Sequence, residues 1–74
     1  MNETIKQLDV VTLLVAMPEN GLAKGQVGAV LEVWSSDAFE VEFVDLNGQT
    51  IAILTLHATQ IMRLCYEQMY QKAA

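Results

Sequence analysis

The chain has 74 residues, of which nine are acidic and four are basic, and its formal net charge is −5. This length predicts one domain, the single cysteine excludes an internal disulfide, and the negative charge argues against a nucleic-acid partner because phosphate backbones are also negative. Since 53% of the residues are hydrophobic, which is high for so small a domain, we expect some apolar surface to be buried against another chain.

Residues 1–7 are predicted to form a flexible N-terminal segment, without the basic patch and long apolar core of a secretory signal. The longest apolar stretch, Val10–Met17, is far shorter than the roughly 20 residues that cross a bilayer. We therefore expect no membrane association and a cytoplasmic location.

The first predicted strand covers Leu8–Val15, which is rich in β-branched residues. A surface loop follows over Met17–Gly21, because Pro18 fixes its own φ and the Asn-Gly pair that ends the loop tolerates a positive φ. Leu22 is an isolated apolar residue in this polar segment, so we expect it to pin the loop to the core.

The second predicted strand covers Gln26–Trp34 and begins after a turn at Gly25. Gly28 interrupts a valine-rich run, and a glycine within a strand is typical of a bulge or a barrel corner, where a neighbouring backbone approaches too closely for a side chain. We expect Trp34 to lie in the core or in a subunit contact rather than in an aromatic groove, since burial of an indole removes a large area from water.

The third predicted strand, Phe39–Val44, alternates apolar and acidic residues with a period of two. The core-facing residues are predicted to be Phe39, Val41 and Phe43. Glu40 and Glu42 then share a solvated face, where a basic partner surface could bind them. A catalytic carboxylate pair is the weaker interpretation, because acid-base pairs also need environments that separate their pKa values.

The fourth predicted strand, Gln49–Leu56, forms a hairpin with the third. Its turn has either two residues, Asn47 and Gly48, or three, with Leu46 added and a glycine bulge. We favour the three-residue turn, because Asp45 can accept hydrogen bonds from the turn and Gly48 suits the left-handed position.

The two turns predict different registers for the fourth strand. The two-residue turn pairs Phe43 with Ala52 and leaves Ile51 and Ile53 on the outer face. The three-residue turn pairs Phe43 with Ile51 and leaves Ala52 and Leu54 outside. Both registers therefore leave apolar side chains exposed on this strand.

A single helical turn is predicted at His57–Gln60, before a short closing strand at Ile61–Leu64. Residues 65–74 contain good helix formers, and a helix there would gather one apolar stripe, consisting of Met62, Tyr66, Met69 and Tyr70. We expect no catalytic or metal-binding role for His57 or Cys65, because neither has the partners that such chemistry needs. The five short strands predict a mainly β fold, a small five-stranded SH3-like barrel over residues 8–64 with a short C-terminal helix.

Three motifs occur in order along the chain: Leu8–Val11, Pro18–Val30 and Val41–Thr50. With these motifs the sequence resembles a family of short bacterial proteins, the domain-of-unknown-function family 4926, over roughly Leu8–Leu64. The resemblance implies a compact SH3-like barrel and no assigned activity. A looser likeness connects Gly25-x-x-Gly28-x-Val30 with KOW-type barrels and with the barrel of nitrile hydratase β subunits.

We therefore predict a non-enzymatic protein-interaction module without cofactor or metal, which self-associates as a dimer or caps a protein partner as antitoxins and immunity proteins do. The predicted partner-binding residues are Glu40, Glu42, Ile51, Ala52, Ile53, Leu54, Met62, Tyr66, Met69 and Tyr70. The predicted turn and bulge residues are Pro18, Gly21, Gly25, Gly28, Asn47 and Gly48. The alternatives are an accessory subunit of an enzyme and a KOW-like barrel that binds nucleic acid or the ribosome.

Overall fold

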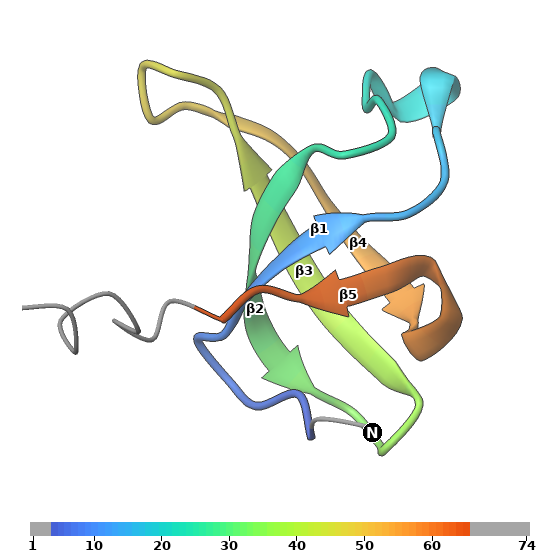
Figure 1. Ribbon diagram of the computed structural model, residues 1–74. Helices are drawn as coiled ribbons and strands as arrows, with labels where there is room; N and C mark the ends of the chain where they lie inside the picture. Colours follow the sequence, from blue (N-terminus) through green and yellow to red (C-terminus); the bar gives the residue numbers. More distant parts are fainter. Residues whose placement is uncertain (1–3, 66–74) are drawn as a thin grey trace, which may run out of the picture.

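The computed structural model describes residues 4–65, which form one antiparallel sheet of five strands (Figure 1). The strands are β1 (Val10–Leu13), β2 (Val27–Val33), β3 (Ala38–Val44), β4 (Thr50–His57) and β5 (Ile61–Arg63). Two short 3₁₀ helices interrupt the connections, η1 (Pro18–Asn20) before β2 and η2 (Ala58–Gln60) before β5. The predicted mainly β class is confirmed, whereas the helix predicted for the C-terminal tail lies, from residue 66 onward, outside the described residues.

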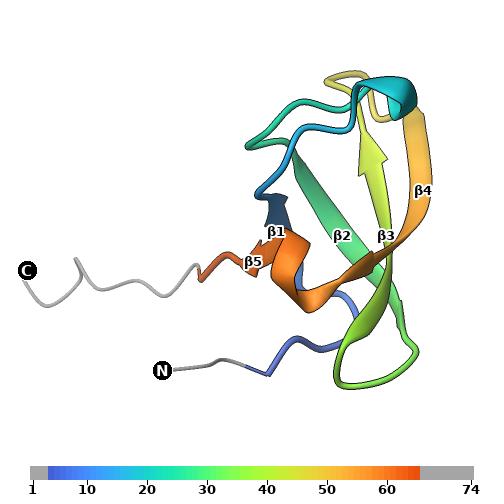
Figure 2. The same cartoon turned by 90° about the vertical axis from the view of Figure 1, so that its right-hand side faces the viewer.

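The strand order in the sheet is β4-β3-β2-β1-β5. Strands β2, β3 and β4 follow one another as a meander, and β1 lies between β2 and β5. The sheet is strongly twisted, so that β1 and β5 lie side by side across the face of the meander (Figures 1 and 2). Strands β4 and β5 form the two edges of the sheet over residues 4–65.

The core fills the space inside this twisted sheet. Its buried residues are Val11, Leu13, Leu22, Val30, Phe39, Val41, Phe43, Leu56 and Ile61. The predicted inward orientation of Phe39, Val41 and Phe43 is confirmed by this burial. Leu22 is also buried, and its backbone forms an isolated bridge with Met17 across η1, so the prediction that it anchors the loop is confirmed.

A bulge in β2 corrects the expectation for Trp34. The register passes from Val30 opposite Val41 to Glu32 opposite Glu40, which leaves Leu31 as an extra residue. Without the bulge Trp34 would share the inward face of Val30, since side chains alternate along a strand. The extra residue reverses this parity, and Trp34 is 57% exposed. Of the two predicted places for Trp34, the core is wrong, and a subunit contact stays a prediction.

The turn between β3 and β4 has the predicted three residues. The N–H of Asp45 donates to the carbonyl of Gln49 at 2.9 Å, and the N–H of Gly48 donates to the carbonyl of Asp45 at 3.0 Å. The Asp45 carboxylate accepts the N–H groups of Asn47 and Gln49 at 2.8 and 2.9 Å. Gly48 has a φ of +80°, the left-handed conformation that favours glycine.

The register that we favoured for β4 is nevertheless wrong, because a second bulge follows the turn. Val44 pairs with Thr50, but Phe43 pairs with Ala52, so Ile51 is an extra residue on β4. Beyond the bulge the strand therefore has the register that a two-residue turn would give. Ala52 and Leu54 pack against the core, while Ile51 and Ile53 are exposed.

Gly28 lies in a regular stretch of β2, opposite Val11 on one side and Phe43 on the other. Of the two features predicted at this position, a bulge or a barrel corner, the bulge is wrong, since the irregularity of β2 lies at Leu31. The predicted close approach is confirmed: a Cβ atom on Gly28 would lie 2.8 Å from the Glu42 carbonyl oxygen and 2.8 Å from Cδ1 of the Phe43 ring.

We expect Gly28→Ala to lower the free energy of unfolding by about 1 to 3 kcal/mol, because the added methyl group overpacks a buried site against backbone and ring atoms. Chemical denaturation followed by circular dichroism would measure the change. Val27→Ala is the matched control, since Val27 is the exposed neighbour on the same strand. Equal stability of Gly28→Ala and the parent chain would contradict the prediction.

Candidate functional site

Two carboxylates and two uncharged side chains share the outer surface where β3 meets β4. Glu40 lies opposite Thr55, and Glu42 lies opposite Ile53. All four side chains point away from the core, because Val41 and Phe43 alternate with them on the inner face. We call Glu40, Glu42, Ile53 and Thr55 the β3–β4 outer surface.

The charge of this surface is negative. The hydroxyl of Thr50 on β4 donates to Oε2 of Glu42 at 2.6 Å. Glu32 of β2 lies opposite Glu40, which places a further carboxylate beside the surface. Ile53 is 48% exposed. Exposed apolar area next to carboxylates suits contact with an apolar surface that carries basic residues.

A groove of about 540 Å³ lies where the N-terminal segment meets η2 and β5. Ile5, Val33 and Phe39 contribute apolar lining, and Thr59 and Arg63 contribute polar groups. Sequence reasoning missed this groove, because its walls come from the beginning, the middle and the end of the described chain, and no motif connects these segments. The residues that line it include neither histidine nor cysteine.

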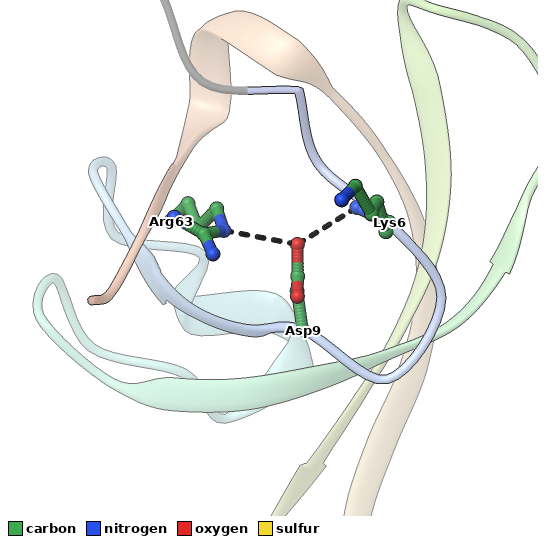
Figure 3. A network of polar contacts seen from close by, with 3 residues as sticks. All are labelled: Lys6, Asp9 and Arg63. Atoms are coloured by element: carbon green, nitrogen blue, oxygen red, sulfur yellow. Dashed lines mark hydrogen bonds and ion pairs between the residues drawn. The ribbon is translucent and has the colours of Figure 1, made fainter. Parts of the chain in front are cut away.

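Asp9 joins the N-terminal turn to the last strand (Figure 3). Its Oδ2 accepts the backbone N–H of Lys6 at 2.8 Å and the Nε–H of Arg63 at 3.1 Å. The turn from Lys6 to Asp9 contains Leu8 in the left-handed conformation, with a φ of +75°. Because the carboxylate already binds donors from two segments, we assign Asp9 a structural role.

His57 and Cys65 are both exposed. The backbone N–H of His57 donates to Oε1 of Gln60 at 2.8 Å, so His57 stands at the beginning of η2 as a helix cap. Within residues 4–65 no group of three or more His, Cys, Asp or Glu side chains could hold a metal ion. None of the helical segments in the same range is long and apolar enough to cross a membrane.

The predicted partner-binding residues fall into separate groups. Ile51 and Ile53 are exposed on β4, while Ala52 and Leu54 are half-buried and face the core. Met62 is 51% exposed but lies on β5 at the opposite edge of the sheet. The remaining members of the predicted stripe, Tyr66, Met69 and Tyr70, lie outside the described residues.

The predicted turn residues lie in the connections between strands. Pro18 begins η1, and Gly21 follows it with a φ of +74°. Gly25 has a φ of +90° in the turn before β2, and Asn47 and Gly48 belong to the three-residue turn of the β3–β4 hairpin. Of these positions, Asn47 and Gly48 shape the hairpin that carries the β3–β4 outer surface.

The twisted sheet, its buried core and its exposed edge strand β4 define a small all-β domain. The family model described as Domain of unknown function (DUF4926) matches residues 7–63. Since this match covers most of the chain, the protein belongs to that family. Comparison with curated proteins and with solved structures gave no match.

We expect Asp9→Asn to lower the free energy of unfolding by about 1 kcal/mol, because the amide keeps the shape of the side chain but loses the charge that binds Arg63. Thermal and chemical denaturation would measure it. Glu19→Gln is the control, since this substitution also removes one negative charge, but at an exposed position in η1. A loss of the same size in both variants would contradict a specific role for Asp9.

Proposed function

We propose that this protein is a non-enzymatic protein-interaction module, built on an SH3-like barrel and acting in the cytoplasm. The strand order supports the barrel, because a strongly twisted five-stranded antiparallel sheet with its first strand between the second and the fifth is an arrangement of small barrels. The short η2 between β4 and β5 also fits this arrangement.

The exposure of Ile53 on the β3–β4 outer surface is the observation that carries the proposal. Burial of its apolar side chain in a complex would supply binding energy, and the neighbouring Glu40 and Glu42 would favour a partner with basic residues at the rim of its contact surface. A small acidic domain with an apolar contact surface has the physical profile of an antitoxin or an immunity-type inhibitor. This last comparison is an analogy of properties.

Two other functions remain as alternatives. An accessory subunit of an enzyme would use the same apolar surface, and it would be recovered with a larger catalytic chain. A KOW-like role in binding nucleic acid would need a basic stripe. The described cations lie apart, Lys6 in the N-terminal turn, Lys24 before β2 and Arg63 in β5 beside Asp9, so the charge pattern favours a protein partner.

Affinity purification of the tagged full chain from its native host, followed by mass spectrometry, would test the proposed function. We expect the tagged parent chain to retain a second copy of itself or another protein. The Ile53→Ser variant is expected to lose this partner, because the substitution removes the apolar anchor of the outer surface. Leu46→Ser is the matched control, since Leu46 is a fully exposed apolar residue in the β3–β4 turn. Identical recovery with both variants would contradict the proposal.

We further expect no measurable binding to duplex DNA or RNA at physiological salt, because non-specific affinity comes mainly from neutralised phosphates and the chain has a net charge of −5. Fluorescence anisotropy with a labelled duplex would test this expectation across a series of salt concentrations. Micromolar binding that weakens as salt rises would favour the KOW-like alternative instead.

A further inference from the structure

The outer edge of β4 presents backbone groups that no other strand engages within residues 4–65. The N–H of Ala58 donates to the carbonyl of Asp37 at 2.9 Å, which makes these two residues a hydrogen-bonded pair. Hydrogen-bonded pairs alternate along an antiparallel ladder. In the register of β3 and β4, Leu54 and Leu56 therefore bond toward β3, whereas Ile53 and Thr55 direct their N–H and C=O groups to the free side.

Two features limit the free part of this edge. At one end, the bulge at Ile51 interrupts the regular ladder. At the other end, the N–H of His57 also points away from β3, but it donates to the side chain of Gln60 at 2.8 Å. The regular, unengaged segment is therefore Ile53–Thr55, which we call the open edge.

The open edge lacks the usual protection against pairing with another strand. Natural edge strands carry charged side chains or proline that prevent such pairing. None of the eight residues of β4 is Asp, Glu, Lys, Arg or Pro, although the chain as a whole carries a net charge of −5. A second copy of this acidic chain can approach along β4, because the approaching strands bring no like charges face to face.

The open edge is also complementary to itself under two-fold symmetry. An axis at Leu54 places Ile53 beside Thr55 of the partner subunit, and Thr55 beside Ile53 of the partner subunit, which engages all the free backbone groups of both copies. The two facing side chains are β-branched, a favourable cross-strand combination. Leu54, which is half-buried, would meet its own copy on the inner face.

We propose that two copies of this protein associate through β4, antiparallel and centred on Leu54, so that one sheet continues across both subunits. This inference rests on the proposed function, because it names a second copy as the partner of the same strand. Main-chain hydrogen bonds would position the two copies, and the uncharged side chains of β4 would exclude water between them.

Analytical ultracentrifugation of the full chain over a range of concentrations would test the inference. We expect a dimer at micromolar concentration, and an increase of at least about 100-fold in its dissociation constant in Thr55→Pro, which removes an outward N–H but leaves the ladder with β3 intact. Thr55→Val is the matched control, because valine keeps the β-branched shape and the backbone donor. A monomeric parent chain, or equal dimerisation of both variants, would overturn the inference.

A disulfide test keeps the inference falsifiable if Thr55→Pro does not fold. In a Cys65→Ser background, Leu54→Cys is expected to form a disulfide between the two copies on mild oxidation, since directly opposed residues of a non-hydrogen-bonded pair lie within bridging distance. Leu46→Cys in the same background is the control, because its turn lies beyond the open edge. Absence of the disulfide in Leu54→Cys, or cross-linking of the control to the same extent, would overturn the proposed geometry.

The two proposals fail in different ways. If the parent chain is monomeric in the centrifuge, but retains another protein in a manner that depends on Ile53, self-pairing is overturned and the interaction module stands. If the parent chain dimerises through β4 and Ile53→Ser disrupts the dimer, both stand. If the chain neither dimerises nor retains a protein, both are overturned.

Discussion

The contact between the Phe43 ring and the backbone of Gly28 is the constraint on which the rest of the fold depends. It brings β2 and β3 together without an intervening side chain, and Gly28 also pairs with Val11 of β1. The residues around this point, Val11, Val30 and Val41, are fully buried. Three strands are thus held at one close-packed place, and the twisted sheet positions its edges relative to it.

Two bulges then decide which side chains reach the surface. The bulge at Leu31 turns Trp34 outward, and the bulge at Ile51 turns Ile53 outward while Leu54 faces the core. Each bulge changes the orientation of every residue that follows it on its strand. The composition of the candidate site is therefore a product of local irregularities as much as of the alternating sequence pattern.

The sequence predicted the strands, the inward residues of β3 and the three-residue turn, because period-two alternation and turn chemistry are local signals. It did not predict either bulge. Ile51 begins an unbroken apolar run that continues to Leu54, so this segment shows no alternation that could reveal an extra residue. Asp9 and Arg63 were not paired either, since 54 positions separate them in the chain and a single sequence carries no signal for so distant a contact.

The distance along the chain between Asp9 and Arg63 has a consequence for the order of assembly. The meander of β2, β3 and β4 needs only neighbouring segments, whereas β5 must return to β1 from the far end of the domain and pays the larger loop-closure entropy. We expect the meander to form first and β5 to dock last. Until it does, β1 is a second open edge, and a growing chain exposes both ends of its sheet to other strands.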